Sequence, residues 1–266
     1  MNTFIQEFID DPEAIFYCSH SGGKDSQAMY LALVKLVPAE RICLVHADLG
    51  EVEWAGTQEH IHRTTQHHLN VVESYYADKG RLSPGVEPGS RKTLLVEVER
   101  KMRVSPDQPP WPSSSARWCT SDLKTGPIYK FIRQDMAARG ATSAVNCMGI
   151  RAEESPARAK KPPVKRNATL SKAGRTVYDW YPIFEWSTEM VFSHIKRAGQ
   201  SAHPAYADGN ERLSCMFCIL GSANDLAHAS RVRPELAAKY FNLEARSGYT
   251  LFHKKSLADK IASDRV

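Results

Sequence analysis

The hydrophobic positions of this chain occur in short apolar runs, and longer segments with helical periodicity separate these runs. Five apolar runs are expected to form strands, at 14–18, 41–46, 70–75, 142–149 and 176–183. The clearest helical patterns follow at 25–38, 53–69, 122–139 and from residue 187 onward. Because parallel strands need crossover helices between them, this alternation predicts an α/β fold with a doubly wound parallel sheet.

Three parts of the chain depart from this alternation. Residues 77–116 are irregular and rich in proline, with one short helix expected at 90–102. Residues 158–175 contain seven Lys or Arg and no Asp or Glu, and they show neither helical nor strand periodicity. That segment fits either a solvated, mobile loop or a basic flap that closes on phosphates. The remainder is helical, so we expect a small C-terminal helical subdomain at 201–266 after a domain at 1–200.

Composition narrows the class of protein only modestly. Thirty-five Lys and Arg against 30 Asp and Glu give a net charge of +5, which permits a polyanionic partner without requiring one. The N-terminal residues are acidic, and no stretch of 18 apolar residues occurs. A cytoplasmic protein with no membrane partner is therefore expected. Six cysteines in such a chain are not expected to form a disulfide framework.

The segment 21–26, Ser-Gly-Gly-Lys-Asp-Ser, lies between the first expected strand and the first expected helix. Two glycines let the backbone approach an anion closely, and amides at the start of a helix can hold it. The spacing is not that of the Walker loop, because Asp25 follows Lys24. We interpret the segment as a nucleotide site. The simpler alternatives are a surface turn and, for Asp25, a helix cap.

The cysteines and histidines offer a second kind of chemistry. Cys18 and Cys43 lie in apolar strands and are expected to be buried, whereas the role of Cys147 stays open. Cys215 and Cys218 form a Cys-x-x-Cys pair that needs at least one further metal ligand. The metal at such a pair is either iron, in an iron–sulfur cluster, or zinc. A second group, His60, His62, His67 and His68, is expected to consist mostly of solvent-facing helix residues.

Five motifs occur here in the order seen in the phosphoadenosine phosphosulfate reductase family, and together they give the chain a resemblance to it over about 14–220. They lie at 21–26, 46–50, 117–124, 149–155 and 215–218. The wider family includes ATP pyrophosphatases of DNA phosphorothioation, of the DndC and SspD type. The resemblance implies an adenine nucleotide alpha hydrolase-like, Rossmann-like fold.

The resemblance also implies a site for ATP and Mg²⁺. Its expected nucleotide-binding residues are Ser19, Ser21, Gly22, Gly23, Lys24, Asp25, Ser26, Asp48, Gly149, Arg151 and Arg158. Its expected catalytic residues are Lys24, Asp25, Lys124 and Arg151. Lys24 and the loop amides would neutralise the negative charge that develops as pyrophosphate leaves. The other basic candidates for binding phosphate are Lys124, Arg151 and Arg158. Asp25 and Asp48 are candidates for Mg²⁺ or for contacts to the nucleoside.

A cofactor follows from the same resemblance. Cys119, Cys215 and Cys218 match family positions, and they are expected to hold a [4Fe–4S] cluster with an open iron that can carry sulfur. No fourth ligand is evident, although Cys147 is a candidate. The chain nevertheless departs from the sulfonucleotide reductases, because no cysteine follows Cys218 and only one thiol stands at Cys119.

These departures favour ATP cleavage and sulfur transfer over reduction of a sulfonucleotide. In this hypothesis an acceptor oxygen is adenylated and sulfur then displaces AMP. DNA is the expected acceptor, and a cysteine desulfurase is the expected sulfur donor. Three alternatives stay open: a phosphoadenosine phosphosulfate or adenosine phosphosulfate reductase, an adenylyltransferase like FAD synthetase, and a noncatalytic module that binds nucleotide or DNA.

Overall fold

The computed structural model describes residues 3–79 and 83–263, and it divides the chain into two compact units. The first unit comprises Met1–Ala47, Gly56–Val72 and Ile128–Pro204. The second comprises Asp48–Ala55, Glu73–Pro127 and Ala205–Val266. The chain passes between the units for the last time after Pro204, and the expected domains at 1–200 and 201–266 stay a prediction. Two earlier segments, which the sequence placed in the first domain, belong to the second unit.

A six-stranded sheet forms the centre of the first unit. Its strands are β1 (Ile15–Ser19), β2 (Ile42–Ala47), β3 (Leu69–Val72), β4 (Ser143–Met148), β5 (Val164–Arg166) and β6 (Thr176–Trp180). Their order across the sheet is β3-β2-β1-β4-β6-β5, and every neighbouring pair is parallel except β5 with β6. The predicted α/β class and the predicted parallel sheet are therefore confirmed.

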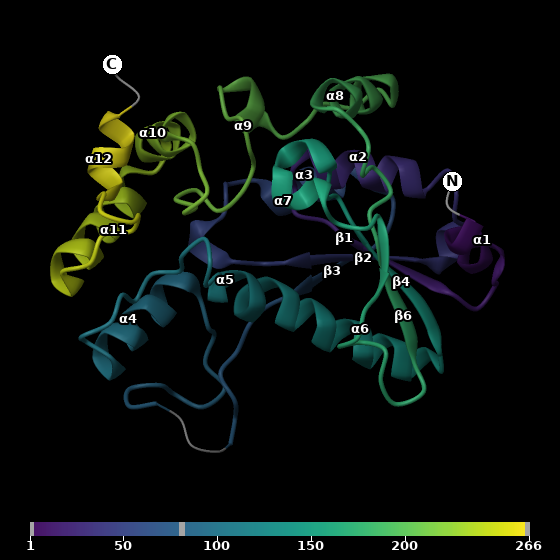
Figure 1. Ribbon diagram of the computed structural model, residues 1–266, viewed down its shortest axis with the longest axis horizontal. Helices are drawn as coiled ribbons and strands as arrows, with labels where there is room; N and C mark the ends of the chain where they lie inside the picture. The colour runs from purple at the N-terminus through teal and green to yellow at the C-terminus, as the bar shows by residue number, and fades with distance from the viewer. Residues whose placement is uncertain (1–2, 80–82, 264–266) are drawn as a thin grey trace. The chain divides into compact units, whose positions relative to one another are not determined.

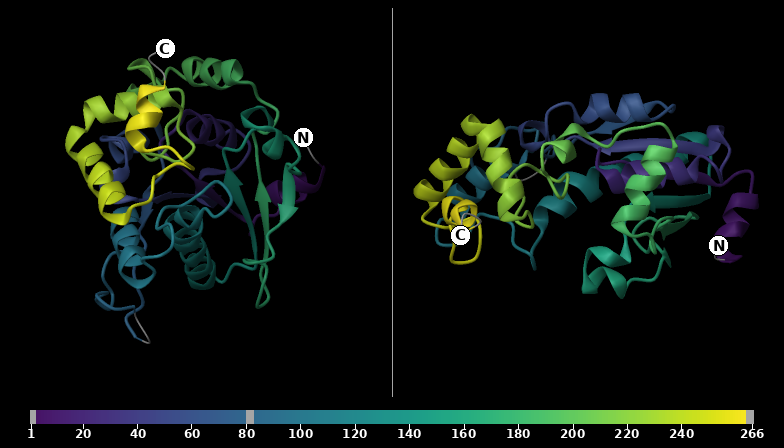
Figure 2. Two further views of the ribbon diagram at one scale, coloured as in Figure 1. Left: turned by 60° about the vertical axis from the view of Figure 1, so that its left-hand side comes forward. Right: turned by 90° about the horizontal axis from the view of Figure 1, so that it is seen from above.

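Helices cover both faces of this sheet (Figure 1; two further views in Figure 2). Side chains alternate along β1: Phe16 and Cys18 enter one apolar core, while Ile15 and Tyr17 enter another. The first core is shared with α1 (Thr3–Asp10), α2 (Lys24–Leu33), α3 (Thr57–Thr64) and α8 (Thr188–Arg197). The second core is shared with α6 (Gly126–Arg139). This two-sided covering explains why the central strands are almost continuously apolar.

Strand β5 lies in the basic segment 158–175, where no strand was expected, and that expectation is wrong. Lys165 pairs with Asp179 and Arg166 with Tyr178 in the antiparallel register. The Asn167 side-chain oxygen then accepts hydrogen bonds from the backbone N–H groups of Thr169 and Leu170. Leu170 is fully buried. The basic segment is therefore anchored to the edge of the sheet and is not a free loop.

The second unit is mainly helical. Its helices are α4 (Leu94–Val104), α5 (Trp118–Thr120), α10 (Ala223–Val232), α11 (Pro234–Ser247) and α12 (Leu257–Ala262), with a π-helical turn at Ser121–Thr125. The 3₁₀ turn Gly50–Val52 also belongs to this unit, and α9 (Pro204–Ala207) begins at the last residue of the first unit. The first unit contains the short helix α7 (Pro156–Ala159) and the 3₁₀ turns Ala39–Arg41 and Ala152–Glu154. In the core of the second unit the Trp111 ring stacks on Tyr240 at 5.7 Å between ring centroids. The predicted helical character of the C-terminal region is confirmed.

Across the residues described, none of the helices combines the length and the apolar character needed to cross a bilayer.

Candidate functional site

The loop at 20–23 connects the carboxyl end of β1 to the first turn of α2. Gly22 has a φ of 77°, a left-handed conformation that favours glycine. Gly23 is the N-cap of α2, and no side chain caps this helix within the described chain. The order of the strands reverses between β1 and β4, because β2 lies on one side of β1 and β4 on the other. Ligands of open α/β sheets bind at such a switch point.

Hydrogen bonds within the loop fix its conformation. The Ser26 hydroxyl donates to the Gly23 carbonyl at 2.8 Å and accepts from the Ser21 backbone N–H at 3.2 Å. The Gly22 backbone N–H donates to Nδ1 of His20 at 3.1 Å. Three residues of the loop are thus tied to neighbouring groups before any ligand arrives. Preorganisation of this kind is what a site for a charged ligand requires.

Gly149, which follows β4, packs directly against the first turn of α2. A Cβ atom at this position would lie 2.7 Å from the carbonyl carbon and oxygen of Asp25, and 2.8 Å from the Ser26 nitrogen. Real Cβ contacts essentially never fall below 3.0 Å. Only glycine therefore fits here without a shift of the backbone. The structure brings this predicted residue to the loop.

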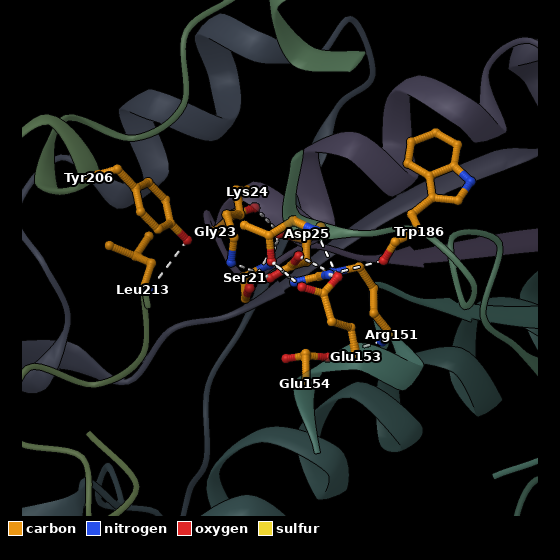
Figure 3. A network of polar contacts seen from close by, with 12 residues as sticks. Ser21, Gly23, Lys24, Asp25, Arg151, Glu153, Glu154, Trp186, Tyr206 and Leu213 are labelled. Atoms are coloured by element: carbon orange, nitrogen blue, oxygen red, sulfur yellow. Dashed lines mark hydrogen bonds and ion pairs between the residues drawn. The ribbon is translucent and has the colours of Figure 1, made fainter. Parts of the chain in front are cut away.

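Asp25 joins the loop to two cations. Its carboxylate is 3.0 Å from Nζ of Lys24 and 2.6 Å from Nε of Arg151, and Figure 3 shows these contacts. Both basic side chains are buried, whereas the Asp25 side chain keeps 19% of its surface exposed. The three predicted residues therefore form one ion-pair network at the start of α2.

Arg151 is held on every side by protein groups. Besides Asp25, its guanidinium donates to Glu153 at 3.1 Å, to the carbonyl of Trp186 at 3.0 Å and to Oγ1 of Thr188 at 3.1 Å. Its side chain is 3% exposed. The sequence suggested a guanidinium open to phosphate, but in this structure Arg151 fixes Asp25. Its partners Glu153 and Thr188 were not anticipated.

Two further predicted residues of the first unit have nearby partners. Arg158 forms an ion pair with Glu154, and its backbone N–H donates to the Ser155 hydroxyl at 3.2 Å. Glu154 also accepts from the Arg151 backbone N–H at 3.0 Å. The Ser19 hydroxyl donates to Oδ1 of Asn146 on β4 at 3.3 Å. Glu154 thus contacts the Arg158 side chain, whereas Ser155 caps the short helix α7 through the Arg158 backbone.

Buried histidines lie beside the loop, and sequence reasoning missed them. Burial, reinforced by His46 and His60, lowers the pKa of His20 to about 3. Burial also lowers the pKa of His60 to about 4, with contributions from His203 and Arg63. Nε2 of His60 lies 3.2 Å from Oε1 of Gln27. His60 therefore contradicts the expectation of a solvent-facing residue, because this face of α3 packs toward α2, while His62 and His68 are exposed as expected.

The lowered pKa values have a defined consequence for stability. Both histidines bind a proton more weakly in the folded chain than in the unfolded chain, where the reference pKa is 6.5. Their contribution to stability is therefore fully present above pH 6.5. It is lost as the pH falls toward the folded pKa values, since the unfolded chain then binds more protons.

Asp48 belongs to the second unit, where it has its own partners. Its carboxylate accepts from the Gly50 backbone N–H at 2.6 Å and pairs with Arg91 at 3.0 Å. Arg91 also pairs with Glu73 at 2.9 Å. The expected role of Asp48 in binding Mg²⁺ or nucleotide stays a prediction.

Cys119, Cys215 and Cys218 share one electrostatic neighbourhood in the second unit with Lys124. Burial raises the pKa of the Cys215 thiol to about 11, although the Lys124 ammonium opposes this shift. Burial also raises the pKa of Cys119, and Lys124 again acts in the opposite direction. Conversely, Cys215 is the main cause of the raised pKa of Lys124. Lys124, predicted to act on phosphate, is thus associated with these thiols.

The thiols do not form a metal centre in this arrangement. Among the residues that the structure describes, no group of three or more His, Cys, Asp or Glu has the geometry to hold a metal ion. Cys147, the candidate fourth ligand, is fully buried in β4 of the first unit, and Cys18 and Cys43 are buried in strands as expected. The three thiols therefore do not fit an iron–sulfur cluster or zinc as they stand.

A parallel sheet with a glycine loop at its switch point is typical of nucleotide-binding α/β proteins. The chain belongs to the phosphoadenosine phosphosulfate reductase domain family, whose model matches residues 15–220. This is a family of nucleotide-utilising enzymes.

Individual proteins resemble the chain more weakly. An uncharacterised 37.8 kDa protein of Escherichia phage 186 is 28% identical over 93% of this chain and 81% of its own length. A phosphoadenylyl-sulfate reductase from Candida auris, solved as a phosphate complex, has a TM-score of 0.46 at 14% identity and covers 81% of this chain and 87% of its own. An FMN adenylyltransferase from Candida glabrata, solved with FAD and inorganic pyrophosphate, has a TM-score of 0.42 at 15% identity and covers 80% and 59%.

Proposed function

We propose that this protein is an ATP pyrophosphatase that adenylates an acceptor oxygen for sulfur transfer. The observation that carries the proposal is the loop between β1 and α2. It is fixed by its own hydrogen bonds, it opens a ten-residue helix that no side chain caps in the described chain, and it lies at the switch point of the sheet. Backbone amides and the positive end of a helix dipole suit such a site to phosphate.

In this proposal the loop holds the phosphates of ATP while the acceptor oxygen attacks the α-phosphorus. The bond from that phosphorus to the bridging oxygen breaks, and pyrophosphate leaves. Lys24 and the amides at the start of α2 neutralise the charge that develops on the leaving group. Arg151 acts through Asp25, whose position it fixes from the buried side.

Mg²⁺ fits the donor set at the loop, because it prefers one or two carboxylates together with substrate phosphates. Asp25 offers one partly exposed carboxylate there. When bound, Mg²⁺ would add positive charge beside the phosphates. The proposal assigns no step to an iron–sulfur cluster, because no group of three or more His, Cys, Asp or Glu among the described residues could hold a metal ion.

The acceptor that we propose is a nonbridging oxygen of a DNA phosphodiester, as in the DNA phosphorothioation enzymes that the motifs resemble. The basic segment 158–175 supports a polyanion, because it has no carboxylate and β5 anchors it to the edge of the sheet. Its exposed basic side chains are Lys160, Lys161, Lys165, Arg166 and Lys172. Hydrosulfide, which a thiol reductant releases from the persulfide of a cysteine desulfurase, would then attack the phosphorus of that DNA phosphodiester. The bond from this phosphorus to the adenylated oxygen breaks, and AMP leaves.

The test is incubation of the protein with duplex DNA, ATP, Mg²⁺, a cysteine desulfurase, cysteine and a thiol reductant, followed by mass spectrometry of the digested DNA. Thio-dinucleotides are expected with the wild-type chain. They should be lost in Lys24→Met and retained in Lys35→Met, which removes an exposed lysine from the same region of sequence. Pyrophosphate release without any thio-dinucleotide would refute DNA as the acceptor but leave the pyrophosphatase intact.

A further inference from the structure

His20 is anchored between the sheet and the loop. Its backbone N–H donates to the Val45 carbonyl at 2.8 Å, and its carbonyl lies 2.9 Å from Nδ1 of His46. Its side chain is only 2% exposed. The residue is therefore fixed to β2 by its main chain, and its imidazole has little freedom to move.

The imidazole is the acceptor for one amide of the loop. The Gly22 N–H donates to Nδ1 of His20 at 3.1 Å. Ser26 Oγ is 3.4 Å from the same nitrogen, but its hydroxyl proton is directed to the Gly23 carbonyl at 2.8 Å. Because Nδ1 accepts, the ring is neutral and its proton is on Nε2.

This bond determines which way the Gly22 peptide faces. An N–H that points to a buried imidazole cannot point to an anion in front of the loop. The N–H groups that can bind an anion are then those in the first turn of α2, where Gly23 is the N-cap. Without an acceptor at this position the Gly22 amide would be buried and unpaired, which favours rotation of the peptide.

We propose that His20 is a positioning residue of the loop, and that its Nδ1 turns the Gly22 amide inward so that the first turn of α2 receives the anion. The role in anion binding rests on the function proposed above. The inward orientation of the amide does not depend on that function.

Three variants of His20 distinguish the effect of the hydrogen-bond acceptor at the Nδ1 position from the effect of side-chain size. His20→Asn places an amide oxygen near the position of Nδ1, His20→Gln places one near Nε2, and His20→Leu offers none. In the protein labelled with ¹⁵N-glycine, we expect the Gly22 amide to exchange slowly in wild type and His20→Asn. It should exchange at least about tenfold faster in His20→Leu and His20→Gln, the size expected when a buried amide loses its partner.

Inorganic pyrophosphate is the probe for the anion. By calorimetry, wild type and His20→Asn should bind it with similar affinity. His20→Leu and His20→Gln should bind it about tenfold more weakly, since the loop amides are no longer preoriented. Near-UV circular dichroism checks that each variant is folded. If His20→Leu does not fold, the comparison of His20→Asn with His20→Gln decides.

Three results overturn the proposal in different ways. Wild-type affinity for pyrophosphate in a folded His20→Leu or His20→Gln refutes the positioning role alone. Absence of pyrophosphate binding by the wild-type protein refutes the positioning role and the proposed function together. Rapid exchange of the Gly22 amide in the wild-type protein refutes the inward orientation itself.

Discussion

Replacement of Gly149 by alanine should displace the nucleotide loop without removing any polar side chain. The new Cβ would lie 2.7 Å from the carbonyl carbon and oxygen of Asp25, whereas ordinary contacts begin at 3.4 Å. Relief of the clash therefore needs a displacement of 0.7 Å, the difference between these two distances. The atoms in contact belong to the main chain, so no change of rotamer can supply it.

Two effects of this displacement can be estimated. Overpacking of this kind should lower the free energy of unfolding by about 1–3 kcal/mol. Because the displaced atoms form the first turn of α2, the rate of ATP cleavage should also fall, by up to about 100-fold for a misplacement approaching 1 Å. The measurements are urea unfolding and the rate of AMP formation.

Gly140→Ala provides the matched control. Gly140 has a φ of 66°, and nothing lies within 4 Å of a Cβ built there. Alanine should cost about 1–2 kcal/mol of stability through its left-handed backbone conformation alone. We expect Gly140→Ala to keep the wild-type rate of ATP cleavage at a comparable loss of stability. Equal losses of rate in the two variants, or no loss in Gly149→Ala, would refute the reasoning.

Three further predictions concern the ionisable side chains of the two units. Arg151→Met should lower the free energy of unfolding by about 1.5–3 kcal/mol, because Asp25 keeps its ion pair with Lys24 but loses its charged hydrogen bond to Arg151; urea unfolding measures this loss. Stability should fall between pH 7 and pH 5, by about 2 kcal/mol for each of His20 and His60, because the unfolded chain takes up their protons. The decrease should be shallower in His20→Asn. Lys124→Met should raise the pKa of Cys215 further, so that iodoacetamide alkylates this thiol more slowly at pH 8; unchanged alkylation would remove Lys124 from the thiol neighbourhood.

The parallel sheet could be predicted from sequence because its central strands are buried on both faces and therefore continuously apolar. The loop could be predicted because its glycines and its position between strand and helix depend only on neighbouring residues. Strand β5 could not, because it has three residues, follows two prolines and carries exposed Lys165 and Arg166 at a sheet edge. Local patterns of that length carry no reliable period.

The partners of the site side chains could not be predicted from neighbouring residues in the sequence. Arg151 was recognised as a functional candidate, but its bond to Asp25 spans 126 positions of sequence and its bond to Thr188 spans 37. Only the tertiary structure shows that these bonds occupy the guanidinium. The burial of His60 was missed for a related reason. Most residues of α3 are polar, so the sequence does not show which face of this helix packs toward α2.

The products formed from ATP show whether the protein cleaves the nucleotide between its α- and β-phosphates. The protein would be incubated with ATP labelled at both the α- and the γ-phosphorus, Mg²⁺, duplex DNA, a cysteine desulfurase, cysteine and a thiol reductant. The nucleotide and phosphate products would then be separated and counted. ATP cleavage by the protein should give AMP and pyrophosphate in equal amounts, with both lost in Lys24→Met and retained in Lys35→Met. Formation of ADP and phosphate, or an unchanged rate of AMP formation in Lys24→Met, would contradict it.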